Sequence, residues 1–109
     1  MIKNMQNIEI DINDFMNIKD NDDVVVIDMR SDIERSYGNI KNSIHLDGEN
    51  IKNDPLHDAN KNYIICCSRG KTSYERAKEL RDRGFSNYYS LKGGYSSYVL
   101  YMIRNDKQN

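Results

Sequence analysis

Several features are scarce or absent in this sequence of 109 residues. No window holds 18 consecutive apolar residues, so neither a membrane-spanning helix nor a membrane partner is expected. The first seven residues lack the apolar core of a secretory signal. Charges of the two signs nearly cancel, for a formal net charge of −1. Nucleic-acid-binding domains are usually strongly basic, so no nucleic-acid partner is expected. The only proline, Pro55, lies in the polar stretch Asp47–Asn62, which is predicted to be a loop.

Cysteine is also scarce, because Cys66 and Cys67 are the only two and they are adjacent. Adjacent cysteines would close a strained ring, so no structural disulfide is expected between them. Without further cysteines a disulfide framework is excluded, and a reducing, cytoplasmic setting is favoured. His45 and His57 have no cysteine or carboxylate at ligand spacing, and the acidic run 20–23 lacks the Gly and Glu of a calcium loop. No metal site is predicted.

Short β-rich runs alternate with helical patterns along the chain. The expected strands cover residues 8–10, 24–27, 43–46, 63–66 and 88–91. The expected helices follow Asp11 or Asn13, run from Ser31 to near Gly38, run from Thr72 to Gly84, and follow Gly94. Such alternation indicates an α/β fold with a central parallel sheet and helices on both faces. The length indicates one domain over residues 1–109.

Local signals place the helix ends. Ser31 with Glu34, and Thr72 with Glu75, are each typical of a capping box that begins a helix. Gly84 is typical of the residue that follows a helix. Two helix faces are expected to pack inward, one formed by Tyr74, Ala77 and Leu80 and the other by Tyr95, Tyr98, Val99 and Met102.

The segment after the predicted strand 63–66 carries the chemistry. Cys67 follows this strand, and a short loop leads from it into a helix. Sites in parallel sheets form beyond the carboxyl ends of strands, and the backbone N–H groups of a helix N-terminus stabilise anions. These surroundings favour a thiolate, so Cys67 is the predicted nucleophile. Gly70 permits a positive φ, and Arg69 and Lys71 suit an anionic substrate.

The loop Cys67-x-x-Gly70-x-Thr72 resembles the active-site loop of the rhodaneses, the thiosulfate and mercaptopyruvate sulfurtransferases. Other landmarks of the family follow in order over residues 8–103: Asp28-Met29-Arg30 with Glu34, Gly38-Asn39-Ile40 with Ser43-Ile44, Leu80 with Gly84-Phe85 and Asn87, and Leu91-Lys92-Gly93-Gly94. Three places depart from the family pattern: Asn39 replaces a usual His, Lys41-Asn42 a common Pro-Gly, and Tyr98 a usual Trp. None lies in the loop, so they bear on substrate preference.

The resemblance implies a single-domain thiosulfate sulfurtransferase that needs no cofactor. The Cys67 thiolate would take the outer sulfur of a donor such as thiosulfate as a persulfide and pass it to cyanide or a thiol. A protein-bound persulfide is an alternative donor. The backbone N–H groups of the loop would hold the transferred sulfur: Ser68, Arg69, Gly70, Lys71, Thr72 and Ser73. Arg30 either binds the anionic donor or pairs with Asp28 or Glu34.

Other interpretations stay open. A phosphatase or arsenate reductase of the related fold also uses a Cys thiolate, but its loop is one residue longer and ends in Arg, whereas position 73 is Ser. The alternative for Cys67 is a buried structural thiol. The chain could also be a non-catalytic interaction module, since the family includes domains that have lost the nucleophile, although the presence of Cys67 argues against this. Cys66 is expected to pack in the core, with a resolving thiol as the alternative. A phosphate-binding P-loop is rejected, because position 65 is Ile where that motif needs Gly.

Overall fold

A computed structural model describes residues 7–105 of the chain. The ends of the predicted domain, residues 1–6 and 106–109, lie outside the described range. The elements are β1 (Glu9–Ile10), α1 (Ile12–Ile18), β2 (Val24–Asp28), α2 (Asp32–Ser36), β3 (Ile44–His45), α3 (Gly48–Asn53), β4 (Asn62–Cys66), α4 (Lys71–Asp82), β5 (Tyr88–Leu91) and α5 (Gly94–Arg104). No helix in the described range is long and apolar enough to cross a membrane.

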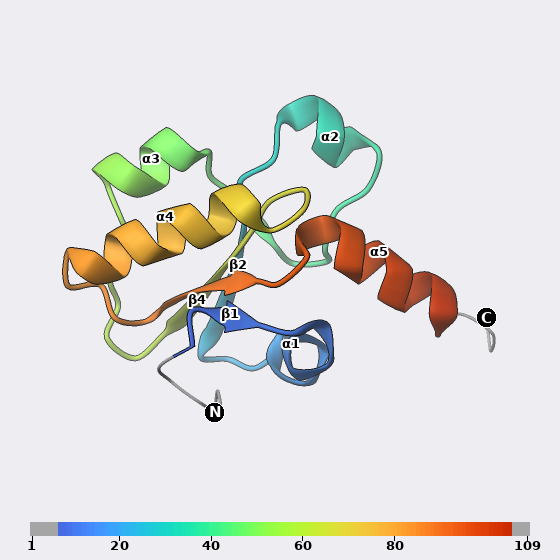
Figure 1. Ribbon diagram of the computed structural model, residues 1–109, viewed down its shortest axis with the longest axis horizontal. Helices are drawn as coiled ribbons and strands as arrows, with labels where there is room; N and C mark the ends of the chain where they lie inside the picture. Colours follow the sequence, from blue (N-terminus) through green and yellow to red (C-terminus); the bar gives the residue numbers. More distant parts are fainter. Residues whose placement is uncertain (1–6, 106–109) are drawn as a thin grey trace.

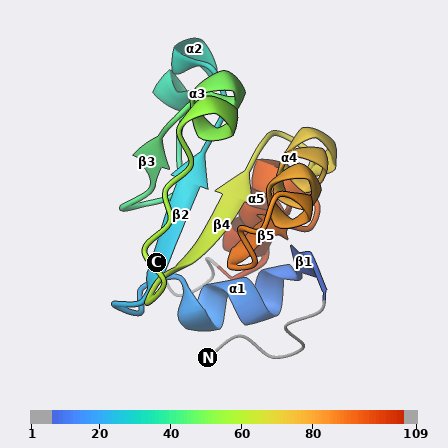
Figure 2. The same ribbon diagram turned by 90° about the vertical axis from the view of Figure 1, so that its left-hand side faces the viewer.

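The five strands form one sheet in the order β1-β5-β4-β2-β3, and every pair is parallel. The predicted α/β fold with a central parallel sheet is therefore confirmed. The longest pairing joins β2 to β4, from Val24 opposite Asn62 to Asp28 opposite Cys66. Figure 2 shows these two strands side by side, with their arrowheads directed toward the end of the molecule that carries α2. The loops that follow the strands therefore meet at this end.

Two apolar cores cover the two faces of the sheet, because successive side chains of a strand point to opposite faces. One core joins Phe15 and Ile64 and is covered by α1 and α5, while the other joins Ile51 and Leu80 of α3 and α4. In Figure 1, α3 and α4 lie above the sheet and α1 lies below it. The uninterrupted apolar run of β2 follows from this arrangement, since both of its faces are covered.

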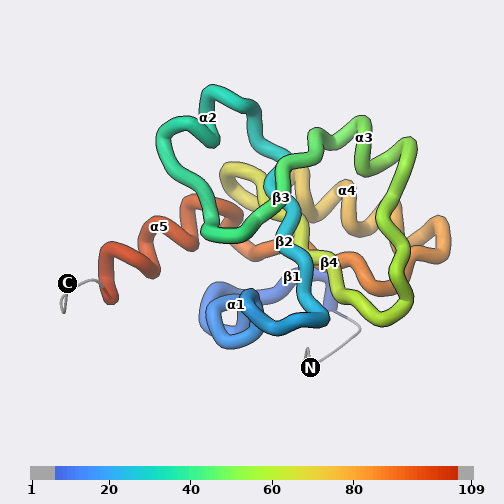
Figure 3. Tube along the Cα trace, turned by 180° about the vertical axis from the view of Figure 1, so that it is seen from behind, coloured from blue at the N-terminus to red at the C-terminus, as the bar shows by residue number. Residues whose placement is uncertain are grey.

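The short helix α2 begins as predicted. The Ser31 side chain accepts from the N–H of Glu34, and the Glu34 carboxylate accepts from the N–H of Ser31. None of the residues of α2 is buried, and the helix lies beyond the carboxyl ends of the strands. Figure 3 shows the connection from α2 to β3 passing beside α5.

The stretch 47–62, predicted to be a loop, contains the helix α3. Asp47 caps it by accepting from the N–H of Asn50 at 2.9 Å, and Ile51 is buried against α4. Only one of the six residues of α3 is a buried apolar residue, so the sequence shows no helical periodicity here. The helix is stabilised by its packing against α4 and not by its local sequence pattern. The prediction was wrong for this segment.

The capping box predicted at Thr72 and Glu75 is also wrong. α4 begins at Lys71, its N-cap is Gly70 in the left-handed region, and no side chain caps it. The face of α4 that packs inward consists of Ser73, Ala77 and Leu80, whereas Tyr74 is 37% exposed. The C-terminus agrees with the prediction, since the N–H of Gly84 donates to the carbonyl of Arg81. In α5, Tyr95 and Tyr98 pack on the core, but Met102 is exposed.

Candidate functional site

Cys67 follows directly after β4, at the carboxyl end of the sheet, and is 8% exposed. Its sulfur accepts the backbone N–H of Gly70 at 3.1 Å and that of Ser73 at 3.3 Å. The Ser73 hydroxyl lies 3.2 Å from the same sulfur. The Gly70 amide belongs to the N-cap residue of α4 and the Ser73 amide to its first turn, where a Ser or Asp side chain would normally cap the helix. The Cys67 sulfur therefore takes the place of the missing side-chain cap.

The loop keeps this shape because α5 packs against it. The N–H of Tyr95 donates to the carbonyl of Cys67 at 2.7 Å, and the N–H of Ser96 to that of Ser68 at 3.0 Å. Gly70 has φ +93°, a value that glycine adopts without strain. A Cβ on Gly94 would meet the Cys67 carbonyl and lie 2.6 Å from the N–H nitrogen of Gly70. A residue without a side chain at position 94 is therefore required for the close approach of α5 to the loop.

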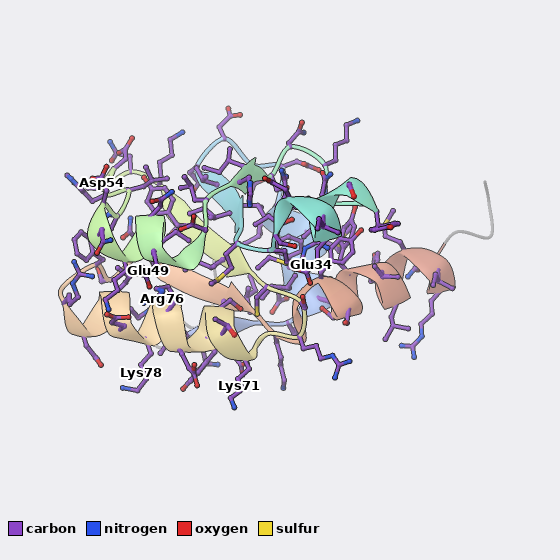
Figure 4. The ribbon with its side chains drawn as sticks, turned by 90° about the horizontal axis from the view of Figure 1, so that it is seen from above. Glu34, Glu49, Asp54, Lys71, Arg76 and Lys78 are labelled. Carbon is purple, nitrogen blue, oxygen red and sulfur yellow. The ribbon has the colours of Figure 1, made fainter. Side chains whose placement is uncertain are left out.

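A pocket of about 360 Å³ opens above the sulfur. Its lining comes from Arg30, Glu34, Cys67, Ser68, Arg69, Lys71 and Thr72. The Glu34 carboxylate accepts from the Ser68 hydroxyl at 2.8 Å and so ties α2 to the loop. Figure 4 shows Glu34 on α2, above the beginning of α5, and Lys71 at the start of α4 with its side chain directed outward. Hydrogen bonds from the Ser31 N–H and from the Ser68 and Ser31 hydroxyls lower the pKa of Glu34.

Arg30 lies in a buried ionic cluster beside the pocket. Its guanidinium donates to the Asp28 carboxylate at 2.9 Å and to the Gly38 carbonyl at 2.8 Å, and stacks on the Tyr95 ring at 3.7 Å. Arg35 donates to the same carboxylate at 3.2 Å. Burial raises the pKa of Asp28, but the hydrogen bonds and charge of Arg30 and the bond from Arg35 outweigh it, so the net shift is downward. Arg30 therefore both pairs with Asp28 and lines the pocket.

Cys66 lies on the other face of the sheet. It is fully buried in the core covered by α1 and α5, as predicted, and its thiol donates weakly to the Cys67 carbonyl at 3.4 Å. Burial, foremost, and the charge of Asp28 raise the pKa of the Cys66 thiol. A core thiol with a raised pKa is a poor nucleophile at neutral pH.

Most of the residues proposed from the sequence are brought together. All of the loop residues 67–73 lie around the sulfur or at the pocket mouth. Asp28 holds Arg30 in place by accepting a hydrogen bond from its guanidinium. The sequence reasoning missed two members: the Glu34 carboxylate as part of the pocket, and Ser90 behind Ser73. The sequence singled out Glu34 as a helix cap, as part of a family landmark and as a possible partner of Arg30, but not as part of the pocket. Within residues 7–105, no group of three His, Cys, Asp or Glu side chains is placed to hold a metal ion.

A family model described as Rhodanese-like domain matches residues 11–100 of the chain. The thiosulfate sulfurtransferase GlpE of Ectopseudomonas mendocina is 36% identical over 72 residues, which are 65% of this chain and 66% of that protein. A tRNA uridine(34) hydroxylase of Cytophaga hutchinsonii is 34% identical over 91 residues, which are 78% of this chain. The chain spans only 29% of the length of that hydroxylase.

Solved structures agree on the fold. A rhodanese-related protein from Thermoplasma volcanium is 27% identical, has a TM-score of 0.71, and matches over 84% of this chain and 89% of its own. The Bacillus anthracis protein CoADR-RHD has a TM-score of 0.77 at 23% identity, over 90% of this chain and 17% of its own. At that identity the second likeness concerns the fold alone.

Proposed function

The chain belongs to the rhodanese-like family, and from that premise we propose that it is a sulfurtransferase that carries sulfane sulfur on Cys67. The observation that carries the proposal is the Cys67 sulfur itself. It accepts two backbone N–H groups, from Gly70 and Ser73, at the base of an open pocket flanked by Arg69 and Lys71. Donors held around a sulfur in this way stabilise its thiolate form, which is the form that attacks.

The proposed reaction has two steps. The Cys67 thiolate attacks the outer sulfur of thiosulfate, a new S–S bond forms at Cys67, and the S–S bond of thiosulfate breaks so that sulfite leaves with the electron pair. Cyanide or a thiolate then attacks the outer sulfur of the persulfide, and the Cys67 thiolate is released. Every electron pair is accounted for, so the cycle needs no oxidant, reductant or cofactor. A reducing, cytoplasmic setting would keep Cys67 free for this cycle.

The pocket supports an anionic donor. The side chains of Arg69 and Lys71 are exposed at its mouth, and the Arg30 guanidinium lines its wall. The Glu34 carboxylate, ionised at neutral pH because its pKa is lowered, lines the pocket from α2 and is bound to Ser68. We propose that this carboxylate directs an anion toward the two cations and away from α2, because like charges repel.

Two alternatives have different consequences. A phosphatase of the related fold would need an arginine at the end of the loop, where this chain has Ser73 with its hydroxyl against the sulfur. Hydrolysis of p-nitrophenyl phosphate would support that alternative. The likeness to a tRNA uridine(34) hydroxylase concerns under a third of that protein, so a role in RNA modification would require the rest of such a protein.

The test is to compare cyanide-dependent thiocyanate formation from thiosulfate in two cysteine variants. Cys67→Ser should abolish turnover, because a hydroxyl forms no persulfide. Cys66→Ser should keep most of the activity, with about 1–3 kcal/mol lost in stability from a polar atom in the core. Equal loss of activity in both folded variants would contradict a single nucleophile and favour a dithiol mechanism.

A further inference from the structure

Behind the sulfur of Cys67 lie two serine hydroxyls that no solvent reaches. The Ser73 hydroxyl is 3.2 Å from the sulfur, and the Ser90 hydroxyl is 2.7 Å from that of Ser73. Both serines are fully buried. They meet because Ser90 of β5 pairs with Ile65 of β4, and Cys67 follows two residues later on the same face.

The direction of the two hydrogen bonds follows from proton counting. In the described part of the chain the Ser90 hydroxyl forms a hydrogen bond with Ser73 and with no other side chain or backbone group. A buried hydroxyl hydrogen without an acceptor destabilises the fold, so Ser90 must donate to Ser73. The Ser73 oxygen then receives a hydrogen from Ser90. A Cys67 thiol also donates to this oxygen, but a Cys67 thiolate has no hydrogen to donate, so the Ser73 hydrogen is then directed to the sulfur.

We infer that Ser90 is a positioning residue that orients the Ser73 hydroxyl as the third hydrogen-bond donor to the Cys67 sulfur. With the two backbone N–H groups, the sulfur then receives three donors from the buried side. A thiolate accepts such bonds more strongly than a thiol, because bonds to a charged acceptor are stronger than neutral ones. The pair therefore favours the attacking form of Cys67 in the free protein. It also favours that form as the group released when the persulfide loses its outer sulfur.

Other charged groups line the pocket above this sulfur, and they also affect the stability of the Cys67 thiolate. They are Arg30, Glu34, Arg69 and Lys71, all on the solvent side in the pocket lining. Cys66 adjoins Cys67 in the chain but points to the other face of the sheet. Salt screens the exposed charges at the pocket mouth but not the buried serine pair.

The inference rests on the proposed function only for the identity of the nucleophile. Its test is therefore alkylation of Cys67 by iodoacetamide, measured as a rate against pH by peptide mass spectrometry with fragmentation to separate Cys67 from Cys66. Ser73→Ala should move the profile to higher pH by about one unit, a tenfold lower rate at a fixed pH below the midpoint. Ser90→Ala should move it in the same direction by less, about two- to fourfold in rate.

The double variant distinguishes positioning from a general structural effect. Ser90→Ala should add nothing in the Ser73→Ala background, because Ser90 acts only through Ser73. Ser90→Thr keeps the hydroxyl and should restore the original profile. Tyr88→Phe removes another buried hydroxyl from the same face of β5 and should leave the profile unchanged. An unshifted profile in folded Ser90→Ala, or additive shifts in the double variant, would overturn the inference. Neither result would affect the sulfur-transfer proposal.

Discussion

Asp28 organises the wall of the pocket from a fully buried position. Its carboxylate receives Arg30 and Arg35, and Arg30 in turn holds the Gly38 carbonyl and the Tyr95 ring. A buried carboxylate with two guanidinium partners is costly to desolvate, so its net contribution to stability is small, but removing one partner leaves uncompensated buried charge. The value of the cluster is that it fixes α2, the 38–40 segment and α5 around the pocket.

The Asp28 cluster predicts acid sensitivity. The pKa of Asp28 is lower in the folded chain than in the unfolded chain, so its stabilisation is present above the unfolded value of about 3.9 and is lost as pH falls through the folded value. Urea unfolding should therefore show a free energy that declines below about pH 4. Asp28→Asn should cost about 3–5 kcal/mol at neutral pH and flatten that decline.

The matched control is Asp82→Asn, which removes an exposed carboxylate that pairs with Lys78 on α4. An exposed pair contributes about 0–1 kcal/mol, so this variant should unfold nearly as the original does. Equal destabilisation by the two substitutions would contradict the role given to the buried cluster.

Arg69 and Lys71 allow a test of the charge of the donor. Both line the pocket mouth, and Lys71 is directed outward. A charge-assisted bond to a partly desolvated anion is worth about 1.5–3 kcal/mol and an exposed pair about 0.2–1. Arg69→Ala should raise the KM for thiosulfate several-fold or more, Lys71→Ala less, and Lys78→Ala not at all. A neutral organic trisulfide should be nearly indifferent to all three, and added salt should weaken only the thiosulfate reaction.

If thiosulfate kinetics stay unchanged in both Arg69→Ala and Lys71→Ala, the two side chains do not contact the donor. A protein-bound persulfide would then be the better candidate for the physiological donor than a small dianion. The persulfide chemistry of Cys67 would be unaffected by that result.

At the scale of elements, the site is a loop held between two helix N-termini. α4 directs its first amides to the Cys67 sulfur, and α5 directs its first amides to the carbonyls of the same loop. The partial positive ends of both helices therefore lie near the sulfur, where they favour negative charge. The sequence placed the sulfur and α4 correctly, because the strand, loop and helix are contiguous.

The sequence predicts structural features that depend on neighbouring residues in the chain, but not features that depend on packing between distant segments. The box at Ser31 and Glu34 formed, whereas the similar pattern at Thr72 and Glu75 did not, because α4 begins at Lys71 and Thr72 already lies within its first turn. The Cys67 sulfur accepts the N–H of Ser73 in that turn, where no side chain caps the helix. The helix α3 was missed, since only Ile51 signals its buried side. The position of Ser90 near Cys67 could not be predicted from the sequence, because only the pairing of β4 with β5 brings the two residues together.

Strand β5 carries two neighbouring tyrosines that give a matched pair of stability predictions. The Tyr88 hydroxyl donates to the Leu56 carbonyl at 2.6 Å, and burial, foremost, raises the pKa of Tyr88 to about 12. The Tyr89 hydroxyl is buried and has no hydrogen-bond partner within the described residues. Tyr88→Phe should cost about 0.5–1.5 kcal/mol, whereas Tyr89→Phe should be neutral or stabilising by urea unfolding. A larger cost for Tyr89→Phe would show that its hydroxyl is satisfied after all.

At the scale of the whole molecule, the fold places the chemistry at one end. All strands run the same way, so the loops after β2 and β4 and the beginnings of α4 and α5 meet beyond their carboxyl ends. The same arrangement occurs in chains of very different length, since the match covers 89% of the Thermoplasma volcanium protein but 17% of the Bacillus anthracis one. The fold is thus a unit that occurs both nearly alone and as part of larger proteins.

The central claim is that Cys67 alone carries the transferred sulfur, and intact-protein mass spectrometry after incubation with thiosulfate tests it most directly. We expect a gain of one sulfur atom, located at Cys67 by fragmentation, absent in Cys67→Ser and retained in Cys66→Ser. Cyanide should remove this sulfur with release of thiocyanate. No gain in the folded original chain, or a gain located at Cys66, would contradict the account.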